Sequence, residues 1–326
     1  MTQRSKIALR LLFAGAVFGL LCLFIDFNKF VREIQNVSLV VICMCVLSEL
    51  AFYVIESVKL FFLGGFKYRF NPILHSRLLS AFLANFGPGM AVGDVLRVFI
   101  LDRYKPGNKV YVASLLASGR IYGILPLAVV LPIFALLHSG LVEKVGFPSI
   151  LAAGLVGLFI WCSPLFFNSR FNRRLLFTFY LLVKVVSIRR LTRKIYLAFR
   201  SFCSVQNWMV GSATSLVTTL VVIFEFWILS NSLGLDVRFS EWALLVSIIS
   251  VVTFLPVGIG AIGSQDAALA LLAPFFGQSV ESFIAISVLM HVIRMLGTLP
   301  GLLFLGEGIG VMRKIRIELG PGVRRN

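Results

Sequence analysis

Two arginines stand inside long apolar segments of this sequence, where a charged side chain is unfavourable. Arg120 and Arg294 each follow at least ten residues without a charge, so both are expected deep in a membrane. An arginine at mid-bilayer costs at least about 2.5 kcal/mol and usually faces a cavity or an anionic partner. Because a guanidinium group binds phosphate through two parallel hydrogen bonds, the pair predicts a site for a phosphate-bearing headgroup. The alternatives are a structural ion pair with Glu56 or Glu225, or side chains that extend to the membrane surface.

Asp94 and Arg97 are three residues apart, which is the spacing of neighbours on one helix face. They either form a local ion pair that caps a short helix, or Arg97 contacts the substrate while Asp94 holds it in place. Asp266 follows a glycine-rich turn near the other end of the chain, as Asp94 follows an earlier one. All three are candidate substrate-binding residues. His291, one turn before Arg294, either shares its face or is a packing residue.

Two glutamates in apolar segments are candidates to balance the charge of the arginines, together with Asp94. Glu56 has Lys59 three residues later and can pair with it near the cytoplasmic end of its helix. Glu225 has no local cation. It is therefore the better candidate for a partner to an arginine, or for a proton-coupling site.

Composition identifies the elements that must position these residues as membrane helices. The 326 residues are 59% hydrophobic with a mean hydropathy of +0.95, which is too apolar for a soluble domain. Mostly apolar segments, each long enough to cross the hydrocarbon layer as a helix, occur at roughly 7–25, 37–63, 110–137, 148–167, 208–233 and 283–306. The sequence thus predicts an all-α polytopic membrane protein with about six transmembrane helices in a single membrane domain, 1–326.

The distribution of basic residues predicts the orientation of the chain. Most of the 31 lysines and arginines fall on alternate loops, so the positive-inside rule places both termini in the cytoplasm. The first apolar segment lacks a signal-peptide cleavage site and is expected to be retained. The basic and aromatic segment at about 168–207 is expected to be an amphipathic loop on an anionic cytoplasmic leaflet. We expect an integral protein of the plasma membrane, the inner membrane of a bacterium.

Two further apolar segments are interrupted by glycine and proline, and each should begin and end on one side of the membrane. Residues 78–101 are flanked by basic loops, and "FLPVGIGAIGSQDAALALL" from Phe254 is flanked by non-basic ones. A continuous helix is disfavoured there, whereas a re-entrant hairpin is tolerated when it lines a cavity or is buried in protein. The broken ends would let helix N-termini face an anion. The predicted turn residues are Gly87, Pro88, Gly89, Gly93, Pro256, Gly258, Gly260 and Gly263.

The residues around the two hairpins form an internal repeat. The segments "ESVKLFFLGGFKYRFN" and "EFWILSNSLGLDVRFS" align without a gap at an offset of 169, and each hairpin is followed by Arg-x-x-Gly-x-x-Pro, from Arg120 and from Arg294. The repeat units, approximately 39–137 and 208–306, are expected to have opposite orientations and to be joined by a helix and the basic loop. Paired broken helices in an inverted repeat are typical of transporters that bind their substrate near the membrane midplane.

The sequence does not predict an enzyme. Its three histidines, His75, His138 and His291, have no metal-ligand spacing, and no nucleophile motif is present. No cofactor and no metal are expected. The net charge of +17 suits an anionic membrane leaflet, and nucleic acid is not an expected partner.

Three stretches resemble the lysylphosphatidylglycerol synthase transmembrane-region family of flippase-like membrane proteins. "NFGPGMAVGDVLRVFIL" is similar to the family's Asn...Pro-Gly-x-x-Gly-Asp-x-x-Arg stretch, and "LPVGIGAIGSQDAALALL" to its Pro-x-x-x-Gly-x-Gly segment, with "SLLASGRIYGI" between them. The chain departs from the second pattern by placing Gln265 before Asp266, which leaves the role of Asp266 open. The resemblance implies translocation of lipids between leaflets. The chain ends without a synthase domain, so we expect its substrate to come from another protein.

The sequence therefore predicts a lipid translocase that moves an anionic or phosphate-linked lipid between leaflets. Arg97, Arg120 and Arg294 are expected to engage the headgroup. Two alternatives remain open. The protein could be an accessory membrane protein that binds a lipid-linked intermediate for a partner glycosyltransferase or another lipid-modifying enzyme. It could also be a secondary transporter of a small soluble anion.

Overall fold

The computed structural model describes residues 35, 37–86, 90–124, 129–133, 154–159, 161–162, 202–254, 263–306 and 310. All regular secondary structure in this part of the chain is helical, which confirms the all-α prediction. Three described segments are long and apolar enough to cross a membrane: α3 (Leu39–Leu63), α12 (Val205–Ser232) and the segment Val280–Phe304. They correspond to three of the six predicted crossings. The predicted crossings at 7–25 and 148–167 lie wholly or largely outside the described residues.

The chain divides into two compact units, each built from three stretches of sequence. The Asp94 unit consists of Tyr53–Gly123, Cys162–Ser215 and Thr298–Asn326. The Asp266 unit consists of Met1–Phe52, Ile124–Trp161 and Leu216–Gly297. Helices α3 and α12 contribute residues to both units.

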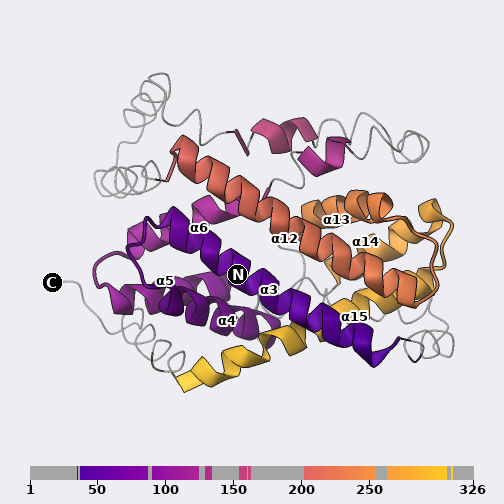
Figure 1. The fold of residues 1–326 in the computed structure, drawn as a ribbon, viewed down its shortest axis with the longest axis horizontal. Helices are drawn as coiled ribbons and strands as arrows, with labels where there is room; N and C mark the ends of the chain where they lie inside the picture. The colour runs from indigo at the N-terminus through magenta and orange to yellow at the C-terminus, as the bar shows by residue number, and fades with distance from the viewer. Residues whose placement is uncertain are drawn as a thin grey trace, which may run out of the picture. The chain divides into compact units, whose positions relative to one another are not determined.

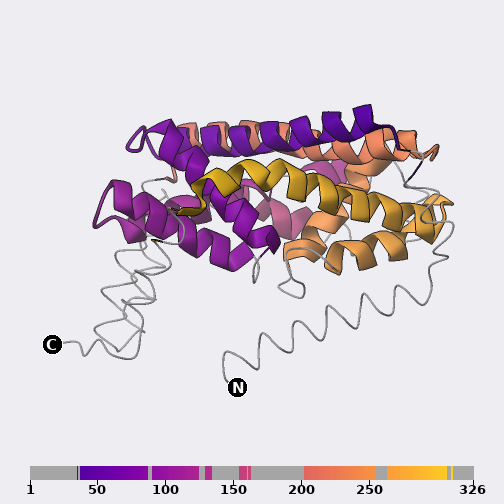
Figure 2. The same cartoon turned by 90° about the horizontal axis from the view of Figure 1, so that it is seen from below.

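The Asp94 unit contains the first predicted hairpin. Its arms are α4 (Phe70–Phe86) and α5 (Met90–Tyr104), which lie side by side (Figures 1 and 2). Helix α6 (Lys109–Tyr122) packs on α5, and the 3-10 helix η3 (Leu299–Phe304) packs on α4. The hairpin is tight because Gly93 of α5 is buried against the backbone of Ser80 in α4. A Cβ atom at position 93 would lie 2.8 Å from the Ser80 carbonyl oxygen, so a larger residue needs the two arms to separate.

The Asp266 unit contains the second predicted hairpin, with arms α13 (Phe239–Phe254) and α14 (Ser264–Leu272), followed by η2 (Ala273–Phe276) and α15 (Val280–Thr298). Its core contains a row of stacked aromatic rings, Phe226, Trp242, Phe283 and Phe276. The ring centroid of Trp242 lies 5.2 Å from that of Phe226 and 5.4 Å from that of Phe283. The Trp242 indole donates a hydrogen bond of 2.8 Å to the Ser230 hydroxyl, so this buried ring has its polar atom satisfied.

The helix bounds follow the internal repeat of the sequence. Both α3 and α12 are followed by a glycine with positive φ, 59° at Gly65 and 72° at Gly234, a conformation that glycine adopts without strain. The next helices begin at Phe70 and Phe239, which are again 169 residues apart. The opposite orientation of the two halves stays a prediction.

The predicted turn residues Gly87, Pro88, Gly89, Pro256, Gly258 and Gly260 lie outside the described residues. Of the remaining two, Gly93 lies within α5 and not in the turn, whereas Gly263 lies at the end of the turn. Gly93 allows the close approach of α5 to α4, and Gly263 directly precedes α14 with a φ of 90°.

We predict that Gly93→Ala destabilises the Asp94 unit. The added methyl group meets backbone rather than a flexible side chain, and overpacking of this kind typically costs about 1–3 kcal/mol. Thermal unfolding of the purified protein in detergent should show a lower Tm than the wild type. Gly306→Ala is the matched control, because a Cβ atom there meets nothing within 4 Å. Equal Tm values for the two variants would contradict the close approach of α4 and α5.

Candidate functional site

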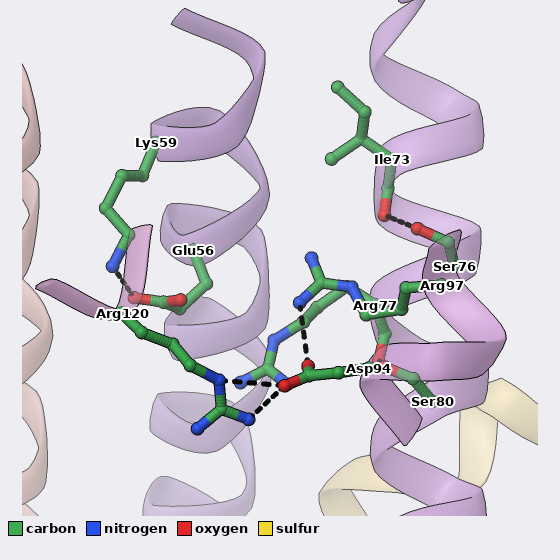
Figure 3. A network of polar contacts seen from close by, with 9 residues as sticks. All are labelled: Glu56, Lys59, Ile73, Ser76, Arg77, Ser80, Asp94, Arg97 and Arg120. Carbon is green, nitrogen blue, oxygen red and sulfur yellow. Dashed lines mark hydrogen bonds and ion pairs between the residues drawn. The ribbon is translucent and has the colours of Figure 1, made fainter. Parts of the chain in front are cut away.

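Asp94 lies at the centre of a cluster of cationic side chains in the Asp94 unit. Figure 3 shows Arg77 of α4, Arg97 of α5 and Arg120 of α6 gathered around it. Arg120 donates a hydrogen bond of 2.8 Å from Nε to Asp94 Oδ2, and its Nη2 atom bonds to the same oxygen. The Arg120 side chain is 49% exposed and that of Asp94 is 30% exposed. This ion pair is therefore accessible from outside the protein.

Arg97 is held much less completely than Arg120. Its Nη1 atom lies 4.0 Å from Asp94 Oδ1, the outer limit of an ion pair, although the residue is only 5% exposed. Its Nε and Nη2 atoms are buried with no hydrogen-bond partner among the described residues. A buried donor without a partner costs about 1–3 kcal/mol, so an acceptor that reached these atoms would be strongly favoured.

The rest of the cluster comes from α3 and α4. Lys59 pairs with Glu56 one turn earlier, as the sequence predicts, and its Nζ atom also donates to the Ser215 hydroxyl at 3.4 Å. The Arg77 guanidinium lies over the Tyr53 ring, 5.1 Å from its centroid. The charges of Arg77, Glu56 and Arg120 all act on Arg97. Three guanidinium groups and one ammonium group therefore face two carboxylates, which leaves an excess of positive charge suited to an anion.

The geometry decides between pairings that the sequence leaves open. The carboxylate partner of Arg120 is Asp94, and the alternative of a structural ion pair between Arg120 and Glu56 is wrong, because Glu56 is paired with Lys59. Arg77 was not among the predicted site residues, because its basic surroundings in the sequence are typical of a cytoplasmic loop. The signal that could have found it is Pro72, since proline is favoured in the first turn of a helix and predicts that Arg77 is helical.

Asp266, in the other unit, is held by contacts to its own helix and to α15. It accepts a hydrogen bond of 2.7 Å from the Gly263 backbone N–H and thereby caps α14. It also accepts a hydrogen bond of 2.5 Å from the Ser287 hydroxyl and lies 3.1 Å from Nε2 of His291. His291 is thus held by a carboxylate as well as by packing. With 4% exposure and three partners, Asp266 positions the hairpin.

Arg294 is held by an amide in this structure. Its Nη1 atom donates a hydrogen bond of 2.7 Å to the Gln265 side-chain oxygen, and Gln265 in turn donates to Ser287 at 3.1 Å. Arg120 and Arg294 therefore both contact a polar residue near the start of a hairpin's second arm, an aspartate in one case and a glutamine in the other. The alternative partner of Arg294, Glu225, is fully buried in α12, and neither of its carboxylate oxygens has a hydrogen-bond partner among the described residues.

Comparison with known proteins gives a match over most of the chain. A family model described as the lysylphosphatidylglycerol synthase TM region matches residues 7–301, which include both hairpins and all the residues discussed above. No curated protein and no solved structure matches the chain significantly.

We predict that Asp266→Asn destabilises the protein more than Asp94→Asn does. Asparagine at position 266 replaces one of two buried acceptor oxygens by an NH2 group, so a present hydrogen bond must reverse its direction or be lost, and losing one costs about 1–3 kcal/mol. Asp94 is 30% exposed, and an exposed ion pair typically contributes no more than about 1 kcal/mol. Thermal unfolding of both variants in one detergent provides the comparison. A larger loss in Tm for Asp94→Asn would show that Asp94, not Asp266, is the structural carboxylate.

Proposed function

Because the chain belongs to the lysylphosphatidylglycerol synthase TM region family, we propose that it moves an anionic or phosphate-linked lipid between the leaflets of its membrane. The observation that carries this proposal is the unused pair of buried Arg97 donors, Nε and Nη2, beside an accessible Asp94–Arg120 ion pair. A phosphate group presents several acceptor oxygens and is matched to guanidinium donors. The proposal places the protein in the inner membrane of a bacterium with both termini in the cytoplasm.

The headgroup phosphate first meets Arg120, because that guanidinium is the half-exposed member of the cluster. It competes with the Asp94 carboxylate for Arg120 and gains the free donors of Arg97, while Arg77 adds positive charge. Asp94 acts as an internal substitute for the phosphate, since it neutralises the arginines when no lipid is bound. Release of the lipid is then favoured by the return of Asp94 to Arg120.

Two further parts of the site belong to the proposal. Glu56 stays paired with Lys59 and keeps that ammonium group in place beside the cluster. Arg294 is the counterpart of Arg120 in the Asp266 unit, where its side chain donates a hydrogen bond to Gln265. We propose no covalent step for this chain.

We predict that Arg97→Gln slows lipid translocation about tenfold or more. The variant removes a charged hydrogen-bond donor, which contributes about 1.5–3 kcal/mol. The assay reconstitutes the protein in liposomes that carry fluorescent phosphatidylglycerol and measures how fast inner-leaflet lipid becomes accessible to an external quencher. Arg103→Gln is the matched control, because Arg103 is an exposed arginine on the same helix outside the cluster and should leave the rate unchanged.

Each outcome of this assay has a distinct meaning. If the wild-type protein does not accelerate translocation, lipid movement by this chain alone is wrong, and the accessory role with a partner enzyme gains support. If wild type and Arg97→Gln are equally fast, translocation stands and the arginine cluster is not its headgroup site. Uptake of inorganic phosphate by the same liposomes would instead support a soluble anion as substrate.

A binding measurement separates recognition from transport. We predict that the gently purified protein retains an anionic or phosphate-linked lipid, detected by native mass spectrometry, and that Arg97→Gln and Arg120→Gln lose it. The Arg103→Gln variant should retain the lipid as the wild type does, since Arg103 is exposed and lies outside the cluster. Equal retention of bulk lipid by all four proteins would contradict headgroup recognition by the cluster.

A further inference from the structure

Glu225, like Arg97, has buried side-chain atoms without hydrogen-bond partners, but its charge is negative where that of Arg97 is positive. Glu225 has 0% exposure, and neither Oε1 nor Oε2 has a hydrogen-bond partner among the described residues. Its helix, α12, is one of the segments able to cross a membrane. An uncompensated charge in such a place costs several kcal/mol, so a carboxylate persists there only with a positive partner.

Among the residues that the structure describes, the charged and titratable neighbours of Glu225 do not supply enough positive charge. Glu49 of α3, itself only 4% exposed, acts on Glu225 with a charge of the same sign. Arg294 of α15 acts on it with the opposite sign, and the Cys45 thiol of α3 also lies within electrostatic reach. Two carboxylates therefore face one guanidinium group, which is already hydrogen-bonded to Gln265. Together, Glu49, Glu225 and Arg294 carry one negative charge in excess.

The internal repeat allows Glu225 to be compared with an equivalent glutamate in the other copy. At the offset of 169, Glu225 corresponds to Glu56, and Leu229 to Leu60, and both leucines are buried. Glu56 is neutralised by Lys59, three residues later. The residue three after Glu225 is Ile228, which packs against the hydrophobic core. One copy of the helix thus has a built-in ammonium group, and the other copy has an apolar side chain in its place.

We infer that Glu225 is a binding site for a monovalent cation, a proton or Na⁺, which takes the place that Lys59 has beside Glu56. A single charge matches the excess of one carboxylate over the guanidinium group. Within the described residues, no group of three or more His, Cys, Asp or Glu side chains is placed to hold a metal ion. The site lies in the Asp266 unit, whereas the proposed headgroup site lies in the Asp94 unit. A gradient of this cation is a source of energy for transport.

The test measures cation binding directly on the purified full chain, without any lipid assay. For Na⁺, Tm is measured in NaCl and in choline chloride at equal ionic strength, and the wild type should be stabilised by NaCl. For a proton, infrared difference spectra between two pH values should contain the carbonyl band of a protonated carboxylic acid. Whichever signal the wild type gives should be lost in Glu225→Gln and kept in the control variant Glu241→Gln, which changes a glutamate in the first turn of α13 in the same unit. Absence of both signals in the wild type, or their persistence in Glu225→Gln, overturns the inference.

A second variant tests the comparison between the two copies. Ile228→Lys places an ammonium group where the first copy has Lys59, so it should remove the Na⁺ or proton signal while Glu225 is still present. A full signal in folded Ile228→Lys would show that the cation does not bind at Glu225. Should that variant fail to fold, Glu225→Gln decides alone. It removes a buried charge and should be at least as stable as the wild type in choline chloride. Because neither measurement involves lipid translocation, their failure leaves the proposed function untouched.

Discussion

The cost of placing a charged side chain in apolar surroundings is the constraint on which the rest of this structure depends. Most buried or half-buried charges of the described residues are balanced locally, Glu56 by Lys59, Arg120 by Asp94, and Asp266 by three donors. Arg97 and Glu225 differ, because buried atoms of their charged groups have no hydrogen-bond partner among the described residues. A ligand that completed this hydrogen bonding would remove the cost of an unsatisfied buried polar group.

The two hairpins use the same elements for different purposes. In each, a glycine lies at the start of the second arm, and a carboxylate follows one or three residues later, as Gly93–Asp94 and Gly263–Asp266. In the first hairpin the glycine permits close packing of the two arms, so the carboxylate is free to face Arg120. In the second the carboxylate caps its own helix and is fully occupied. The two hairpins therefore have similar backbone arrangements, while the carboxylate of the first pairs with an arginine of another helix and that of the second caps its own helix.

Hydropathy and turn residues were sufficient to predict much of the fold. The bounds of α3, α12 and the Val280–Phe304 segment lie within a few residues of the predicted apolar segments, because membrane helices are specified by length and composition alone. The i, i+3 pair of Glu56 and Lys59 was predictable for the same local reason. The Asp94–Arg120 pair was not, because its partners are 26 residues apart and meet only through the return of the hairpin and the packing of α6. Arg77 was missed because its basic surroundings in the sequence resemble a loop, whereas its helix carries it back to Arg97.

The divergence of the two copies explains why opposite charges remain in the two units. If both copies had kept the lysine found at position 59, each glutamate would be permanently neutralised and neither could respond to an ion. If both had lost it, each would hold an excess of negative charge, and the Asp94 unit would repel the anion that its arginines are suited to bind. With Lys59 in one copy and Ile228 in the other, the arginine cluster keeps its positive excess and Glu225 keeps its negative one. In the two proposals made above, this one difference between equivalent positions separates an anion site beside one repeated helix from a cation site in the other.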